Sequence, residues 1–371
     1  MSEDFSWRDG ERTIRFAAGV AREAADVLER EGFEPFGLLT TERAAADAPG
    51  LAERAAAVVH VPAGKVDEIS AELLERMPAA RPGAGRADPL PVTRAGDGGG
   101  APLLVAGAGD ARGDPLPLVA LGGGRVVDTA KALAGATGVR CAAIPTTLSG
   151  AEMTPFHRTP AGVDGARMVR PALVIADPDH MASAPATRLA ASAMNALAHA
   201  MEALYTPLRS PVTDLAALRA AALLADGITR DPPVRGDLAL GALLAGWASG
   251  STGIAFHHAL CQTVVRTAGS PHAETNAVIL PHSARHMAGR APGPMSELAT
   301  ALGDGTGDPE AAAGDIARLA ARCGHTRLAT LGVTEEQLPA AASAAVSHPA
   351  VALTPDPPGE MELLELLRAA L

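Results

Sequence analysis

Residues 121–131 read LGGGRVVDTAK, and this segment decides how the first half of the chain is interpreted. It continues an apolar run that starts at Leu116, which predicts a buried strand ending at three consecutive glycines. The residues after the glycines favour a helix, so the turn offers backbone N–H groups and a helix N-terminus to an anion. The arrangement suits a nucleotide pyrophosphate, although a strand-to-helix turn also uses glycine for purely conformational reasons.

A second motif lies one helix length downstream, where residues 144–155 read IPTTLSGAEMTP. Short apolar segments alternate with helical ones from Thr13 to about Asp177, which predicts a parallel sheet with helices on both faces. The predicted strands cover residues 36–40, 56–61, 116–121, 141–144 and 172–175, and two of the crossover helices cover 20–31 and 128–136.

Beyond Pro178 the strand patterns end and alanine- and leucine-rich helical windows follow, at residues 185–205, 212–226, 237–252, 309–323 and 360–371. We therefore expect an α/β, Rossmann-like nucleotide-binding domain at residues 1–178 and an all-helical domain at 179–371, with the substrate between them. Residues 78–115 are rich in Gly, Pro, Ala and Asp and are interpreted as a flexible insertion in the first domain.

Composition limits the classes of partner. The chain has 371 residues, of which 47% are hydrophobic, and a formal net charge of −11, which argues against nucleic acid or an anionic membrane as partner. Its three cysteines are far apart and form no Cys-x-x-Cys pair, so neither disulfides nor a thiolate metal site is indicated. The N-terminus has no signal-peptide core, and we expect a cytoplasmic protein that acts on a small molecule.

Histidines dominate the candidate chemistry of the helical half. Asn195 and His199 are four residues apart and so share one helix face, and His258 and His272 are separated by 14 residues, with His272 at the start of a helix. A lone histidine is usually a hydrogen-bonded core residue, but three at such spacings favour a site. The remaining histidines considered, which match no such spacing and are interpreted as structural, are His257, His282 and His286.

Taken together, these motifs resemble the iron-containing alcohol dehydrogenase superfamily, and MNALAH at 194–199, PHAET at 271–275 and LPH at 280–282 look like its maleylacetate reductase branch. The resemblance implies the fold shared with dehydroquinate synthases and a homodimer. It also implies binding of NAD(P)H by Gly122, Gly123, Gly124, Arg125, Asp128, Thr146, Thr147 and Ser149.

The chain departs from the superfamily at three positions. Asn195 stands where the usual metal set has an aspartate; if a metal were present, its ligands would be Asn195, His199, His258 and His272, but without the anionic ligand we expect none. Gln262 stands where a further histidine is usual, and glutamine cannot exchange a proton near neutral pH. Arg125 replaces a serine beside the pyrophosphate turn and could instead bind a substrate carboxylate.

Residues at the end of an early predicted strand bear on the selection between NAD and NADP. Thr41 stands where NAD-selective relatives often carry an aspartate that repels a 2′-phosphate, and Arg43 could accept that phosphate, so NADPH is permitted.

The sequence therefore predicts an NAD(P)H-dependent, metal-independent reductase of a small organic acid, ketone or enone. Its catalytic residues would be His199, His258 and His272 as hydrogen-bond donors, with Asn195 and Gln262 beside them. Three alternatives stay open: a non-redox enzyme of elimination or cyclisation on the same fold, a metal-dependent alcohol dehydrogenase, and a catalytically silent binding protein.

Overall fold

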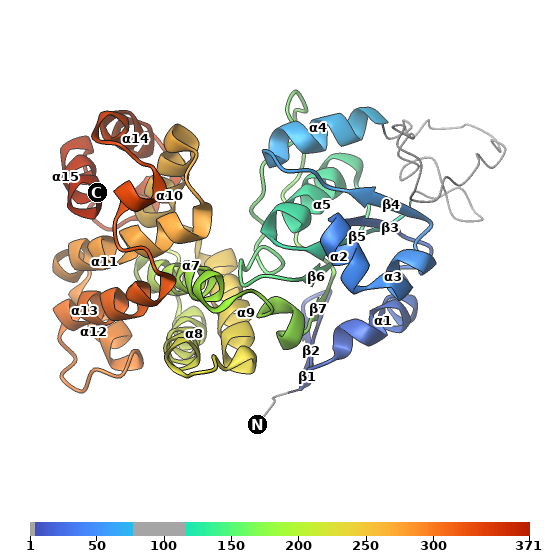
Figure 1. Ribbon diagram of the computed structural model, residues 1–371, viewed down its shortest axis with the longest axis horizontal. Coiled ribbons are helices and arrows are strands. Elements are labelled where there is room, and N and C mark those ends of the chain that lie inside the picture. Colours follow the sequence, from blue (N-terminus) through green and yellow to red (C-terminus); the bar gives the residue numbers. More distant parts are fainter. Residues whose placement is uncertain (1–3, 77–115) are drawn as a thin grey trace. The chain divides into compact units, whose positions relative to one another are not determined.

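The computed structural model describes residues 4–76 and 116–371, so the insertion expected at 78–115 lies outside the described residues. The chain divides into two compact units, each described by itself (Figure 1). Unit 1 comprises Met1–Thr146 and Ala151–Met181, and unit 2 comprises Thr147–Gly150 and Ala182–Leu371.

Unit 1 is built on one seven-stranded sheet with the order β1-β2-β7-β6-β5-β3-β4. All neighbouring strands pair in parallel except β1 and β2, which form an antiparallel pair. The strands are β1 (Phe5–Asp9), β2 (Arg12–Phe16), β3 (Gly37–Thr40), β4 (Ala57–His60), β5 (Leu118–Gly122), β6 (Cys141–Pro145) and β7 (Leu173–Ala176).

Helices cover both faces of this sheet because alternate side chains of each central strand point to opposite sides. Leu118 and Ala120 of β5 belong to one apolar cluster, which includes residues of α4 and α5. Val119 and Leu121 belong to a second cluster, which includes residues of α1, α2 and α3. The helices of unit 1 are α1 (Ala24–Arg30), α2 (Glu42–Asp47), α3 (Pro49–Arg54), α4 (Val66–Arg76), α5 (Gly124–Thr137) and α6 (Pro178–Met181), with a short 3-10 helix at Val20–Glu23 before α1.

The predicted α/β architecture is confirmed, including the parallel sheet and its five expected strands. The pair β1–β2 was not predicted, because charged residues such as Arg8, Asp9 and Arg12 interrupt its apolar pattern. Its place in the sheet depends on contacts distant in sequence, since β2 pairs in parallel with β7 through positions such as Thr13 and Leu173.

Among the described residues unit 2 is entirely helical, as predicted for the second half. Its helices are α7 (Ala186–Tyr205), α8 (Pro211–Thr229), α9 (Arg235–Thr252), α10 (Phe256–Ala268), α11 (His272–Arg290), α12 (Pro292–Ala301), α13 (Pro309–Ala320), α14 (Leu338–Val346) and α15 (Glu360–Ala370). Short 3-10 helices lie at Ala321–Cys323, Leu328–Leu331, Glu335–Gln337 and Pro349–Leu353. Helix α7 is buried over most of its length and forms the centre of the unit (Figure 1).

No single helix in the described ranges is both long and apolar enough to cross a membrane. The required length and apolarity are reached only by α9 and α10 taken together, and this pair is bent by 102°.

Candidate functional site

The glycine turn lies where β5 passes into α5. A Cβ atom on Gly122 would approach the Val126 side chain to 2.7 Å, so the close packing of the turn on the first turn of α5 requires glycine there. Gly123 is the N-cap of α5, and its carbonyl oxygen accepts from Val126 N–H at 2.9 Å. The first N–H groups of a helix have no intrahelical partner, and the prediction that they bind an anion here stays a prediction.

The sheet brings three of the predicted cofactor segments to one edge. The strands β3, β5 and β6 are adjacent and parallel, so their carboxyl ends lie side by side, followed by Thr41, the glycine turn and Thr146. Thr146 N–H donates to the Gly122 carbonyl at 3.0 Å, which ties the second motif to the first. The Thr41 hydroxyl is already used as the N-cap of α2, where it accepts from Ala44 N–H.

The second motif continues into unit 2, to which Thr147–Gly150 belong. The Thr147 hydroxyl is buried without a hydrogen-bond partner among the described residues, and Ser149 is partly exposed. Gly150 has a φ of +70° and lies so close to α9 that an added Cβ would be 3.1 Å from the Gly246 Cα. Only glycine combines that backbone conformation with so close an approach, so the motif is held against the helices.

Two side chains at the start of α5 differ in their surroundings. Arg125 is exposed and forms no ion pair with any described residue, so its guanidinium is available to a ligand. Asp128 pairs with the fully buried Lys131, whose Nζ lies 2.8 Å from an Asp128 carboxylate oxygen. Lys131 was not predicted from the sequence to have a role, but its Nζ also donates to the carbonyls of Ala151 at 2.8 Å and Thr154 at 3.1 Å. Lys131 thus fastens the end of the second motif to α5.

In unit 2, helices α7 and α10 place three of the predicted catalytic residues together. Asn195 and His199 lie on α7 and His258 lies on α10, and the rings of His199 and His258 stack with centroids 4.0 Å apart and planes 17° apart. His258 Nε2 and Asn195 Oδ1 are both buried and have no hydrogen-bond partner in the described part of the chain. Buried polar atoms without partners are uncommon and indicate a place where a ligand or water binds.

Glu202 completes this cluster and was missed in the sequence analysis. Its carboxylate is fully buried, and its two oxygens contact His258 at different atoms: Oε1 accepts from the backbone N–H at 3.1 Å and Oε2 lies 2.6 Å from Nδ1. A signal was present, because residues 195, 199 and 202 share one face of α7. Its partner, however, lies 56 residues away on another helix.

Burial keeps the stacked histidines neutral. It lowers the pKa of His258 to about 3, with a further contribution from the charge of His272. Burial also lowers the pKa of His199, and the neighbouring His258 acts in the same direction. The His199 ring is held from behind by Ser249, whose hydroxyl lies 3.2 Å from Nδ1. Two rings in such close contact cannot both carry a positive charge, so neutral imidazoles are expected at pH 7.

His272 begins α11, as predicted, and reaches the cluster through its charge, which lowers the pKa of both His199 and His258. The Asn276 amide N–H donates to His272 Nε2 at 3.3 Å. Gln262 is partly exposed and follows His258 by one helical turn, so it lies on the same side of α10.

Of the histidines interpreted as structural, His257 lies beside the cluster, with its ring edge-on to that of His258 at a centroid distance of 5.3 Å, but its ring nitrogens are bonded elsewhere. His257 Nδ1 is 2.8 Å from the Ser283 hydroxyl and its Nε2 is 3.1 Å from Asn276 Oδ1, so both ring nitrogens are paired. His286 packs against Phe256 with ring centroids 5.3 Å apart, and partial burial lowers the pKa of both His282 and His286.

The four positions that would bind a metal do not fit a shared ion in this arrangement. An imidazole binds a metal in the plane of its ring at about 2.1 Å. The His199 and His258 rings are stacked, with centroids 4.0 Å apart and planes that differ by only 17°, so their lone pairs lie in separate, nearly parallel planes and do not converge on one ion. No group of three or more His, Cys, Asp or Glu suited to a metal occurs in the ranges that the structure describes.

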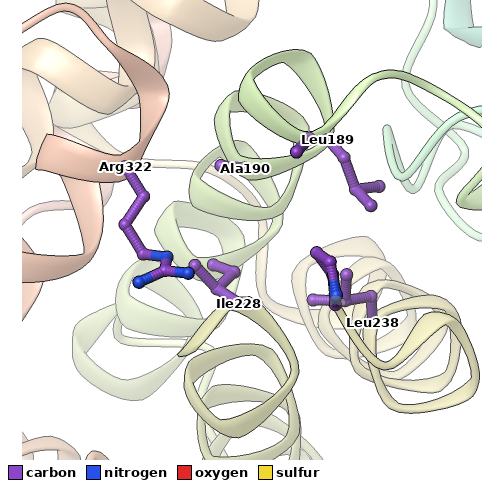
Figure 2. Close-up of a pocket in the computed structure, with 7 residues that line it drawn as sticks. Leu189, Ala190, Ile228, Leu238 and Arg322 are labelled. Atoms are coloured by element: carbon purple, nitrogen blue, oxygen red, sulfur yellow. The ribbon is translucent and has the colours of Figure 1, made fainter. Parts of the chain in front are cut away.

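A small hollow of about 200 Å³ lies elsewhere in unit 2, at the first turns of α7 (Figure 2). Leu189, Ile228 and Leu238 give it an apolar wall, and the guanidinium of Arg322 lies at its side. It contains none of the predicted site residues and is not assigned to the reaction. Its full lining is Ala186, Leu189, Ala190, Ile228, Pro233, Leu238 and Arg322.

Comparison with known proteins identifies the family. The profile described as "Fe-containing alcohol dehydrogenase family, C-terminal" matches residues 189–371. Maleylacetate reductase from Sphingobium indicum is 33% identical over 376 aligned positions, which cover 96% of this chain and 94% of that enzyme. The chain belongs to the iron-containing alcohol dehydrogenase family. It is therefore an NAD(P)-dependent oxidoreductase, as the resemblance of its motifs implied.

Further relatives and solved structures are similar to this chain. Maleylacetate reductase 1 from Rhodococcus opacus is 41% identical over 241 residues, a stretch that spans 66% of that enzyme. The crystal structure of maleylacetate reductase from Agrobacterium tumefaciens superposes with a TM-score of 0.77 at 28% identity, over 100% of this chain and 99% of that chain. Sulfoacetaldehyde reductase from Bifidobacterium kashiwanohense, solved with NAD+, shares the fold with a TM-score of 0.73 at 22% identity.

Proposed function

We propose that this protein reduces a small organic acid, ketone or enone with NAD(P)H, in the manner of a maleylacetate reductase and without a metal ion. The observation that carries the proposal is the neutral cluster of Asn195, His199 and His258, in which Asn195 Oδ1 and His258 Nε2 are buried without described partners. Relatives that align over most of their length are maleylacetate reductases. Unpaired polar atoms would serve ligand binding in either class of protein, so it is the likeness to reductases that favours a reductase over a binding protein.

The residues of the glycine turn fit a dinucleotide. Gly123, Gly124 and the start of α5 would hold the pyrophosphate through backbone N–H groups, and the buried Thr147 hydroxyl offers one more hydrogen bond. Position 41 is a threonine, whose hydroxyl caps α2, so it carries no carboxylate to repel a 2′-phosphate, and both NADH and NADPH are accepted. When bound, the reduced nicotinamide supplies a hydride.

The protein's side chains would stabilise the charge that hydride addition creates. For an enone, the hydride joins the β-carbon, the electron pair of the double bond moves to the carbonyl oxygen, and the α-carbon then takes a proton from water. For a ketone, the hydride joins the carbonyl carbon and the oxygen takes the proton. His199 and His272 would donate hydrogen bonds to the developing oxyanion, with Asn195 orienting His199 or the substrate, and Arg125 is a candidate partner for a carboxylate.

Metal independence is supported by the donor set. Asn195 supplies a neutral amide in place of an anionic ligand, and the stacked rings of His199 and His258 do not converge on one point. Neutral hydrogen-bond donors then supply the polarisation that a Lewis acid would otherwise provide.

The proposal is tested by titrating the purified protein with NADH and NADPH by fluorescence, with metal content measured on the same sample. Maleylacetate and a series of keto acids and enones are then added, and nicotinamide oxidation is followed with and without a chelator. We expect chelator-resistant oxidation of at least one nucleotide. Stoichiometric zinc or iron with chelator-sensitive turnover would overturn metal independence. Loss of substrate without nucleotide oxidation would instead support the non-redox alternative, which Gln262 favours.

We also propose that the enzyme acts as a homodimer in the cytoplasm, on the basis of its family resemblance and its cysteine usage. Light scattering of the purified protein measures the assembly directly. A monomer of 37.4 kDa at micromolar concentration would contradict the dimer.

A further inference from the structure

Glu202 is placed so that both of its oxygens act on one histidine. One oxygen accepts from the His258 backbone N–H at 3.1 Å, and the other lies 2.6 Å from His258 Nδ1. Both side chains are almost completely excluded from solvent, at 0% and 2% exposure, so no water competes for these contacts. The short contact and the burial together indicate a charge-assisted hydrogen bond.

Two backbone N–H groups face the Glu202 carboxylate and stabilise its ionised form. Ala255 is the N-cap of α10 and His258 is the third residue of that helix, and the backbone N–H groups of both stabilise the charge of Glu202. A helix N-terminus offers such groups together with the positive end of its dipole. Burial raises the pKa of Glu202 above its ordinary value, and the charge of the nearby His257 and these backbone groups offset part of that effect.

An ionised carboxylate can only accept, so the proton of the short contact belongs to His258 Nδ1. A neutral imidazole has a single N–H, which leaves Nε2 with a lone pair. We infer that Glu202 is a positioning residue that holds His258 as its Nδ1–H tautomer, so that Nε2 faces the site as a hydrogen-bond acceptor. This differs from the hydrogen-bond donor that the sequence predicted at His258.

The tautomer determines which chemical groups bind at this side of the cluster. An acceptor at His258 Nε2 takes a protic group, which is a water molecule or a hydroxyl of the substrate, and repels an unprotonated carboxylate or enolate oxygen. The anionic oxygen of the substrate is then left to donors such as His199, whose Nδ1 lies 3.2 Å from the Ser249 hydroxyl and whose other nitrogen can carry the proton. The catalytic consequence rests on the proposed reductase function, whereas the tautomer does not depend on it.

The substitution Glu202→Gln inverts the arrangement without changing its size. The His258 backbone N–H is always a donor, so the single amide oxygen of glutamine must face it. The amide NH₂ then faces Nδ1, which forces Nδ1 to become an acceptor and moves the ring proton to Nε2. In a serine protease, the equivalent change of an aspartate to asparagine selects the wrong tautomer and lowers kcat by about 10⁴. We expect a loss of roughly 10²–10⁴ in turnover here.

The tautomer is read by NMR of the full-length protein labelled with ¹⁵N-histidine, because Nε2 couples to both ring C–H protons and Nδ1 mainly to one. The His258 signals are assigned by their loss in His258→Asn. We expect a protonated Nδ1 in the wild type and a protonated Nε2 in Glu202→Gln, with nucleotide affinity changed less than about twofold. Glu310→Gln, on an exposed residue of α13, is the matched control and should leave every readout unchanged.

A protonated Nε2 in the wild type would overturn the inference, and so would a tautomer that is unchanged in Glu202→Gln. The wild-type spectrum alone decides the first point, even if the variant fails to fold. If no acceptor is reduced but the tautomer inverts as expected, the positioning role stands and the proposed function fails. If turnover falls while the tautomer stays the same, Glu202 acts in another way and the inference is wrong.

Discussion

The two sides of helix α10 carry adjacent histidines with opposite surroundings. On one side, His257 has both ring nitrogens paired, with Ser283 and Asn276, and the Cys261 sulfur lies 3.6 Å from its Nε2. On the other side, His258 is paired only at Nδ1, and the next residue on that side is Gln262. Burial lowers the pKa of both histidines to about 3.

Protonation behaviour therefore does not separate the two sides. Both rings are buried and neutral at pH 7, and a search for perturbed titration alone would select them equally. What differs is the completeness of hydrogen bonding, because His258 Nε2 is buried without a described partner. A satisfied histidine serves the stability of the core, whereas an incompletely bonded one beside other polar atoms serves binding.

The largest effect should come from His258→Asn. The asparagine NH₂ can replace Nδ1–H and keep the Glu202 carboxylate paired, so the substitution removes mainly the Nε2 atom. We expect kcat to fall by about 10²–10⁴, which is typical of losing a positioned polar group in an active site. The change is measured by steady-state kinetics with the substrate that the proposed screen of keto acids and enones identifies. A variant that retains wild-type kcat would remove His258 from the site.

His257→Asn is the matched substitution on the other side. The asparagine oxygen can still accept from Ser283, but the contact from Nε2 to Asn276 is lost and a small cavity forms. Because a buried acceptor is left unpaired, we expect the free energy of unfolding to fall by about 2–3 kcal/mol. Urea unfolding measures the stability, and turnover of the folded protein should change less than about tenfold. If turnover of the folded variant falls by more than about tenfold, His257 also takes part in the reaction and the two sides do not differ as argued.

Much of this arrangement was predictable from local sequence. The glycine turn after β5 follows from an apolar run that ends in glycines, and the shared face of Asn195 and His199 follows from helical spacing. Sequence alone could not show that Glu202 is the partner of His258, since the two are brought together by the packing of α7 on α10. The stacking of His199 on His258 has the same origin, because ring contacts between helices leave no periodic pattern.

The strands of unit 1 show a similar limit. The five strands β3 to β7 are short apolar runs and were predicted, whereas β1 and β2 contain charged residues at alternate or adjacent positions. Their strand structure depends on register with a distant partner, as in the pairing of Ile14 with Val174. Strand propensity is strongly dependent on such context.

A third prediction concerns the low pKa that His257 and His258 have in common. Since the folded pKa of each histidine is about 3 and the unfolded value is about 6.5, only the unfolded state binds these protons between those pH values. Stability is therefore complete above pH ~6.5 and falls as the pH drops, by about 1.4 kcal/mol per pH unit for each histidine. Unfolding measured from pH 6.5 to 4.5 should show a slope reduced by about that amount in either asparagine variant. Equal slopes in variant and wild type would show that the substituted histidine is protonated in the fold.

The smallest effect is expected at the next turn of α10, where Gln262 follows His258 and Cys261 follows His257. Gln262 is partly exposed, and Gln262→His introduces a group that exchanges protons near neutral pH. We expect kcat to change by a factor of about three to ten and to acquire a new pH dependence near pH ~6–7. Cys261→Ala, on the bonded side, should leave the pH profile of kcat unchanged while lowering stability. Kinetics from pH 5.5 to 8.5 compare the two. If the pH profile of Gln262→His matches that of the wild type, residue 262 takes no part in proton transfer. The reacting groups on that side of α10 would then end at His258.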